Sequence, residues 1–402
     1  MCATLATSPQ HRVPLRRFAP LLPALLITPL ALSVRYTADF GLAYRGGLEA
    51  WATGHPQRLA SWTAMPFLAV PMATITRLAS EETAARFFMA ANVMLWAALL
   101  MVVWGRLDGR LPSRWWWGSL VAAAVFAPAI ATIFWLQFNL IVFVLALGGF
   151  VLIGRHGGWA ALLIGLSIAL KPILVLLPLV LLIRARSRWV GVWSIAVAGG
   201  LSIAGLVFLA WRANDISLIN PMLYFAEFLN KGGGAMFGCV PENYSPAALL
   251  CRLGLPTSAA IDFSLAACVL VIAWLLARGV PETNEPNWQV FAAACLLSPM
   301  LGPIEWLSYW VLSAPLLLLL VYEFWSRHAP ARLWIGLAVA YALMELVWDP
   351  LESLARTPVP IVVVSYTIGQ FAQYVLLLVW VRWLLLRRTK PVFSTVPAVP
   401  AV

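Results

Sequence analysis

The chain has 402 residues, of which 62% are hydrophobic and 11% charged, with a formal net charge of +11. A soluble domain carries about 25% charged residues, so this composition excludes an ordinary soluble enzyme. Apolar runs of about 17 to 25 residues recur along the chain, and each is long enough to cross a bilayer as a helix. Because backbone inside lipid must satisfy its own hydrogen bonds, the sequence predicts an all-α polytopic membrane protein. It offers no solvated basic face suited to nucleic acid.

Twelve apolar runs are candidate membrane spans. They are 18–34, 63–79, 87–104, 115–133, 136–153, 159–183, 189–210, 257–278, 288–299, 306–323, 332–348 and 360–385. The first run follows several arginines but has no A-x-A cleavage site after it, which favours an uncleaved span over a signal peptide. Residues 1–390 are therefore expected to form one integral membrane domain of about 11–12 helices. The tail, 391–402, is expected to be disordered.

Basic segments predict the orientation, because cytoplasmic loops are enriched in lysine and arginine. Three such segments are RARSR (184–188), EFWSRHAPAR (323–332) and LLRRTK (385–390). With these segments and both termini in the cytoplasm, the outer segments are 35–62, 211–256, 300–305 and 349–359. We take 35–62 as the first outer loop and 211–256 as the second.

The orientation of the first half stays open between two topologies. Twelve spans would export Arg106, Arg110 and Arg114, against the preference for cytoplasmic arginines. If 63–79 lies along the membrane surface instead, these arginines return to the cytoplasm. Another span must then be lost before residue 184.

The first outer loop places Asp39 just beyond the first span. The chain has only 16 acidic residues, and the aromatic flanks of Asp39 would desolvate its carboxylate and raise its basicity. The alternative is an ordinary solvated carboxylate at a helix end. The following residues predict a short interfacial helix in which Arg45 and Glu49, four residues apart, can pair. Arg45 is also a candidate anion ligand, because its planar guanidinium matches phosphate oxygens.

Lys171 is the only charge in LLIGLSIALKPILVLLPLVLL. A lysine in an apolar run indicates a functional site or an internal ion pair, and the alternative is a side chain that snorkels to the interface. Gln137 and Asn139, in FWLQFNLIVF, are polar groups in a similar context. Hydrogen bonding between helices explains them as well as a function does.

The second outer loop supplies further polar candidates. Lys231 begins KGGG, which predicts a hinge or a close backbone approach. Asn243 and Ser245, in PENYSP, can cap a helix or bind a sugar hydroxyl. Glu305 is an acid beside Trp306 in a third outer segment. Cys239 and Cys251 can form a disulfide if the loop faces an oxidising space, but we predict two unpaired thiols.

The order of short motifs resembles glycosyltransferase family 87. The motifs are DF..AYRGG..AW.TGHP, MPFLAVP, LQFNL, ALKP before a basic loop, ENYS and LLSP, within residues 36–320. The resemblance implies a GT-C-type bundle whose outer loops form the active-site cavity. It also implies that Asp39 is the general base, that Gln137 and Asn139 match a GQxN-type motif, and that Lys171 matches a lysine before proline.

The implied activity is inverting transfer of a sugar, with mannose favoured, from a polyprenyl-phosphate donor to a glycolipid or polysaccharide of the cell envelope. No histidine follows the SP motif as in many family members, so arabinofuranose and glucose stay open. The expected site is extracytoplasmic in a multi-pass plasma-membrane protein. No cofactor is implied, and assistance by a divalent metal is left open. The expected substrate-binding residues are Arg45, Glu49, Gln137, Asn139, Lys171, Lys231, Asn243, Ser245 and Glu305.

The cationic residues expected to stabilise the departing phosphate are Arg45, Lys171, Arg212 and Lys231. Two alternatives belong to other classes of protein. A transporter or lipid flippase would use Lys171 and Glu345 as coupling charges, although transporters are commonly built from repeated halves and none is visible here. The other alternative is a noncatalytic protein of envelope assembly.

Overall fold

The computed structural model describes residues 18–33, 38–59, 64–107, 111–215, 240, 243–255, 259–279, 287–301, 305–346 and 367–389. Within these ranges every regular element is a helix, which confirms the all-α prediction. Five helical stretches are long and apolar enough to cross a membrane: Glu81–Trp104, Ser113–Phe134, Arg188–Ala213, Leu307–Ser326 and Thr367–Leu386. The chain thus has the character of a polytopic membrane protein.

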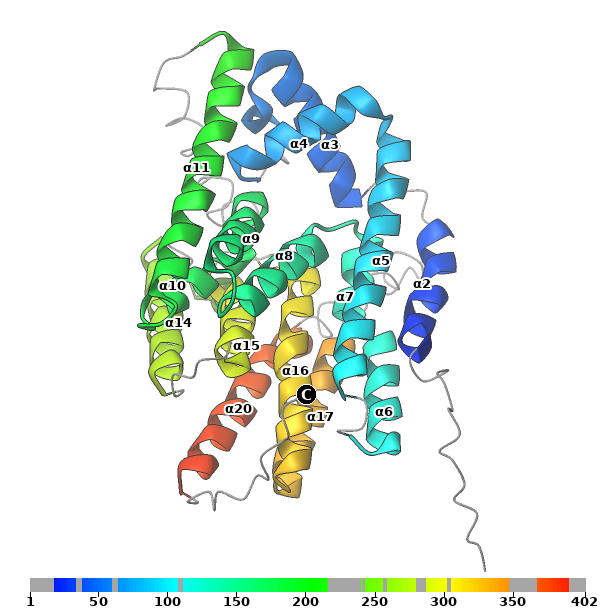
Figure 1. Ribbon diagram of the computed structural model, residues 1–402, viewed down its shortest axis with the longest axis vertical. Helices are drawn as coiled ribbons and strands as arrows, with labels where there is room; N and C mark the ends of the chain where they lie inside the picture. Colours follow the sequence, from blue (N-terminus) through cyan, green and yellow to red (C-terminus); the bar gives the residue numbers. More distant parts are fainter. Residues whose placement is uncertain are drawn as a thin grey trace, which may run out of the picture.

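Figure 1 shows the arrangement of the helices. They are α2 (Leu22–Ser33), α3 (Ala38–Thr53), α4 (Pro66–Leu78), α5 (Glu81–Leu107), α6 (Ser113–Ala124), α7 (Ala127–Phe134), α8 (Asn139–Leu152), α9 (Gly157–Leu170), α10 (Leu176–Leu182), α11 (Arg188–Ala213), α13 (Pro246–Arg252), α14 (Ala259–Gly279), α15 (Trp288–Leu297), α16 (Ala314–Ser326), α17 (Ala331–Glu345) and α20 (Phe371–Thr389). Short 3₁₀ helices are η1 (Ala19–Leu21), η2 (Pro56–Arg58), η3 (Pro172–Leu174), η4 (Pro299–Leu301) and η5 (Leu307–Ser313).

Several predicted spans are shorter in the structure than in the sequence pattern. The run 159–183 is divided, because α9 ends at Leu170 and Lys171 is extended, with φ −157° and ψ 119°. Pro172 explains the break, since proline disfavours helical geometry at the residue before it. Helices α8 and α9 have 14 residues each. Such a helix covers about 21 Å, less than the roughly 30 Å of a bilayer core. The expected number of 11–12 spanning helices is therefore not confirmed.

The run 63–79 forms α4, which has 13 residues and is too short to cross the membrane alone. It packs closely on α3 at Gly47, where a Cβ atom would lie 2.6 Å from the carbonyl carbon of Met72. The end of α3 is held against α11 in the same way. Gly54 has a φ of 74°, and a Cβ there would lie 2.4 Å from the carbonyl oxygen of Leu209. In Figure 1, α3 and α4 lie together at the upper end, between α11 and α5.

Aromatic packing brings the basic segments of both halves to one end of the bundle. Trp115 follows Arg114 directly, and its ring stacks on Trp334 with centroids 4.8 Å apart and lies 5.9 Å from Trp325. The start of α6 therefore lies beside the basic connection between α16 and α17. Helix α4 is not among the five helical stretches long enough to cross the membrane.

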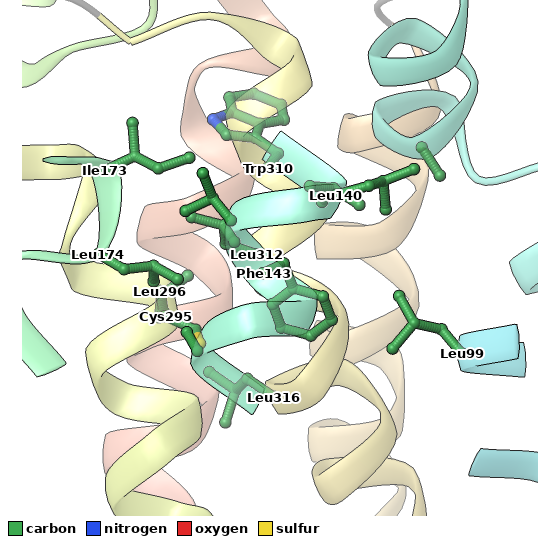
Figure 2. Packing of buried hydrophobic residues seen from close by; sticks show 14 of the residues in the cluster. Leu99, Leu140, Phe143, Ile173, Leu174, Cys295, Leu296, Trp310, Leu312 and Leu316 are labelled. Atoms are coloured by element: carbon green, nitrogen blue, oxygen red, sulfur yellow. The ribbon is translucent and has the colours of Figure 1, made fainter. Parts of the chain in front are cut away.

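The central apolar core packs α8, α15 and the η5–α16 segment together (Figure 2). Leu140 and Phe143 of α8 face Leu312 and Leu316, and all four are buried. Trp310 is also buried, but its indole N–H donates to the carboxyl group of Glu305. The apolar core thus contacts a buried acidic side chain at Trp310.

Candidate active site

Three of the predicted site residues contact one another. The Lys171 ammonium donates hydrogen bonds to Gln137 Oε1 at 2.6 Å and to Asn139 Oδ1 at 2.9 Å. Lys171 is held at the break between α9 and η3, and Asn139 is the first residue of α8. These contacts show that Lys171 points to the interior of the protein, so it is not a lysine that snorkels to the interface.

The turn between α7 and α8, residues 135–139, presents both amides. Leu136 has a φ of 51°, which is unfavourable for a branched side chain and is maintained only where neighbouring contacts fix it. Two such contacts hold Gln137: its N–H donates to the Thr132 carbonyl at 2.9 Å, and its carbonyl accepts from Asn92 at 3.2 Å. We call residues 135–139 the α7–α8 turn.

Asp39 lies beside this turn, in the first helical turn of α3. Its N–H donates to the Trp135 carbonyl at 3.2 Å, so the turn positions Asp39 as well as Lys171. The Asp39 side chain is half-buried. Burial raises the pKa of Asp39, and the charge of Lys171 lowers it in part. The two residues interact electrostatically without a direct ion pair, and a carboxylate of raised pKa is a better proton acceptor.

Tyr309 of η5 is a part of the site that the sequence did not indicate. Its ring faces the Lys171 ammonium, 4.4 Å from the ring centroid, in a cation–π contact. Asp39 and Glu305 both act electrostatically on Tyr309, so the ring is near enough to each carboxyl group to sense its charge. A tyrosine in an aromatic-rich stretch carries no signal that separates it from packing residues.

Glu305 is the centre of a second, fully buried polar network. Its Oε1 atom accepts from Trp310 Nε1 at 3.1 Å and from Gln373 Nε2 at 2.5 Å. Its Oε2 atom has no hydrogen-bond partner among the described residues. Burial raises the pKa of Glu305 to about 8, although the hydrogen bonds from Gln373 and Trp310 oppose this shift. Glu305 is therefore largely protonated at neutral pH.

Asn243 and Ser245 join this network as structural residues. Asn243 Oδ1 accepts from the N–H groups of Glu305 at 2.9 Å and Ser245 at 3.0 Å. Ser245 Oγ accepts from Ala248 N at 3.2 Å and so caps the N-terminus of α13. The helix-capping interpretation of Ser245 is therefore confirmed.

Gln370 and Arg252 complete the network, and the sequence analysis missed both. Gln370 Nε2 donates to the carbonyls of Ser245 at 2.9 Å and Tyr244 at 3.2 Å. Arg252 donates to the Asn243 carbonyl at 2.7 Å and to the Gln370 side chain. One sequence feature could have indicated this network: Gln370 and Gln373 are two amides three residues apart at the start of an apolar run.

Replacing Glu305 with glutamine tests its protonation. The pKa of about 8 in the folded protein exceeds the ordinary value of 4.5, so the folded state binds the proton more tightly. The contribution of Glu305 to the free energy of unfolding should then be greatest below pH 4.5 and fall, until it is lost, as the pH rises toward 8. We expect thermal unfolding in detergent to show this fall in wild type and a weaker one in Glu305→Gln, which resembles the protonated acid. An equal fall in both proteins would contradict the assignment.

The remaining predicted binding residues do not join the two clusters. Arg45 is exposed on α3, and Glu49 accepts a hydrogen bond from Thr53 Oγ1 at 2.7 Å instead of pairing with Arg45. Arg212 donates to the Trp51 carbonyl at 2.6 Å and stacks on the Trp51 ring at 4.3 Å. Lys231 lies outside the described residues.

Glu345, the second coupling charge of a transporter, belongs to a different part of the fold. Both of its carboxylate oxygens lie 3.2 Å from the N–H of Ala127, at the start of α7. A carboxylate at this position satisfies an unpaired N–H and complements the helix dipole. Glu345 thus has a structural explanation that involves no coupling to Lys171.

Cys251 is disulfide-bonded, so the prediction of an unpaired thiol at this position is wrong. Its partner lies outside the described residues. Spacing alone did not reveal the bond, because pairing depends on the distance between the cysteines in the fold. Cys268 and Cys295 are free thiols.

The fold and site together define a helical membrane protein with a carboxylate and an immobilised ammonium at the ends of apolar helices. Such a pair can accept a proton and bind an anion. Within the described part of the chain, no three histidine, cysteine, aspartate or glutamate residues gather to hold a metal ion.

Comparison with known proteins gives the family. The family model of glycosyltransferase family 87 matches residues 62–301, more than half of the chain, and the protein belongs to this family. It is therefore a membrane glycosyltransferase. The matched region includes the α7–α8 turn and Lys171 but begins after Asp39 and ends before Glu305. No similar protein was found among curated proteins or solved structures.

Proposed function

We propose that the protein transfers a sugar, with mannose favoured, from a polyprenyl-phosphate donor to a hydroxyl of a cell-envelope glycolipid or polysaccharide. Transfer takes place at the outer face of the plasma membrane, with inversion at the anomeric carbon. The observation that carries this proposal is that one short turn positions both Asp39 and Lys171. Such a site can serve as a base and as an anion ligand at the same time.

In the proposed reaction Asp39 is the general base. The acceptor hydroxyl gives its proton to the Asp39 carboxylate while its oxygen forms a bond to the anomeric carbon. The bond from that carbon to the phosphate oxygen breaks, and its electron pair leaves with the lipid phosphate. Because a phosphate is a good leaving group, this reaction needs one carboxylate and no general acid.

Lys171 is the proposed ligand of the donor phosphate. An ammonium has three N–H donors, and the described contacts use two of them for Gln137 and Asn139. The third can donate to a phosphate oxygen and stabilise the charge that develops as the bond breaks. Arg45, exposed on the same helix as Asp39, is a second candidate cation.

Two observations support an extracytoplasmic site. Disulfides persist in oxidising compartments, and Cys251 is disulfide-bonded. Cys251 follows Tyr244 in the sequence by seven residues, and the Tyr244 N–H donates to the Glu305 carbonyl. The rings of Trp115 and Trp334 stack on each other. The described residues Arg114 and Arg332 lie close to these two tryptophans in the sequence, so both arginines belong to one region of the bundle, as cytoplasmic arginines do. In Figure 1, α3 lies at the opposite end from α6 and α17.

A transfer assay tests the proposal. Membranes that contain the protein should transfer radiolabel from polyprenyl-phosphate-mannose to an endogenous envelope acceptor, whereas membranes without it should not. With a β-linked donor, inversion should give an α-linked product. An α-mannosidase should then release the labelled mannose from this product. Labelled donor that crosses the bilayer without transfer would support a flippase instead. Labelled polyprenyl-phosphate-arabinofuranose and polyprenyl-phosphate-glucose, used in parallel, identify the sugar.

A further inference from the structure

The Lys171 ammonium is surrounded by three neutral groups. Gln137 Oε1 and Asn139 Oδ1 accept hydrogen bonds from it, and the ring of Tyr309 lies 4.4 Å away. Gln137 and Asn139 are buried, and Asn139 is fully so. Gln137 and Asn139 come from the α7–α8 turn, and Tyr309 comes from η5. We call them the neutral cage.

The neutrality of the cage distinguishes it from an ordinary internal ion pair. A lysine within apolar surroundings usually pairs with a carboxylate, which cancels its charge. Here the partners are carbonyl dipoles and a ring face, which solvate a cation without adding a negative charge. Asp39 interacts with Lys171 but makes no direct ion pair with it.

The orientation of Asn139 supports a cage built for the cation. Its carbonyl oxygen faces Lys171, while its buried Nδ2 group has no hydrogen-bond partner among the described residues. A buried donor without a partner is costly, so a purely structural amide would use both of its groups. The unsatisfied Nδ2 lies on the same amide whose oxygen contacts Lys171, so the side chain is oriented for the ammonium rather than for its own N–H groups.

The turn that bears the cage is itself fixed. Leu136 is held at positive φ, and Thr132 and Asn92 bind the backbone of Gln137. Preorganised dipoles stabilise charge better than mobile ones, because they need no rearrangement during the reaction. The strain at Leu136 is therefore consistent with a turn selected for the position of its side chains.

We propose that Gln137, Asn139 and Tyr309 are positioning residues that hold the Lys171 ammonium, without a direct ion pair, for the phosphate of the lipid-linked donor. This inference rests on the proposed function and assigns these residues a role that acts through Lys171.

The test introduces a compensating charge without a change of shape. Gln137→Glu and Asn139→Asp keep an oxygen next to the ammonium but add a negative charge. We expect the KM for the polyprenyl-phosphate sugar to rise about tenfold to a hundredfold, the range expected for a charged hydrogen bond, with a smaller change in kcat. Tyr309→Leu, which removes the ring without a charge, should raise the KM in the same direction. Gln289→Glu is the matched control, because it adds the same charge in the first turn of α15.

A binding measurement distinguishes the effect of the cage on phosphate binding from its effect on sugar transfer. Free polyprenyl phosphate competes with a labelled photoreactive analogue, and the competition gives its affinity for each variant. Weaker binding in Gln137→Glu, Asn139→Asp and Tyr309→Leu, but not in Gln289→Glu, supports the cage even if no sugar transfer is detected. Unchanged donor KM and unchanged phosphate binding in all three cage variants would overturn it. Transfer by wild type would in that case leave the proposed function intact.

Discussion

Replacing Asp39 with asparagine is expected to lower the rate of sugar transfer by about 10²-fold to 10⁴-fold, the contribution typical of a general base. Asparagine has nearly the same shape and can keep the α3 backbone contact to Trp135, so the fold should be preserved. What it lacks is the basic carboxylate that accepts the proton of the acceptor hydroxyl. The measurement is transfer of radiolabelled mannose by membranes that contain equal amounts of each protein.

Glu82→Gln is the matched control for this substitution. Glu82, like Asp39, is an acid in the first turn of a helix, but it lies exposed on α5 and pairs with Arg86. We expect the control to transfer at the wild-type rate. Binding of free polyprenyl phosphate by Asp39→Asn should stay close to that of wild type, because the base acts on the acceptor. Wild-type transfer by Asp39→Asn would show that another group removes the proton.

The sequence predicted the helical membrane character because composition alone determines it. Where each helix ends was harder to predict, since a run of apolar residues does not reveal a break. The run 159–183 is long enough to form one span, yet Pro172 divides it and places Lys171 in an extended segment. The run 63–79 is apolar enough to resemble a span, but close packing at Gly47 makes it a partner of α3.

The site was predicted where polarity was rare. Lys171, Gln137 and Asn139 were identified because a polar group in an apolar run needs a partner, and the structure shows that they are partners of one another. Tyr309 could not be found in this way, because aromatic residues are common throughout the chain. Its role depends on the position of its ring relative to Lys171, which is a property of the fold.

The network at Glu305 was missed for another reason. Its members Gln373, Asn243 and Trp310 lie far apart in the sequence, and each has an ordinary local explanation. Only the fold shows that they surround one buried carboxyl group. Glu305 itself was identified as an outer acid, but its complete burial and raised pKa could not be inferred from its neighbours in the sequence.

Replacing Lys171 with methionine is expected to lower kcat/KM by about a hundredfold or more, as the loss of a donor to developing negative charge does. It should also move the acid limb of the pH–rate profile. Burial raises the pKa of Asp39, and Lys171 is the charge that opposes this rise. Without Lys171 the pKa of Asp39 should therefore increase further.

Only the ionised carboxylate can accept a proton, so activity is lost as the pH falls through the pKa of Asp39. In Lys171→Met this loss should therefore occur at a higher pH than in wild type. The measurement is kcat/KM for the lipid-linked donor across the acid range, with residual transfer by the variant followed over long incubations. Lys171→Arg keeps the positive charge near Asp39 but changes its geometry. It should therefore keep the acid limb near the wild-type position even where its donor KM is raised. Removal of a neighbouring cation must raise the pKa of a carboxyl group with which that cation interacts. An acid limb that does not move in Lys171→Met would therefore show that Asp39 is not the titrating base.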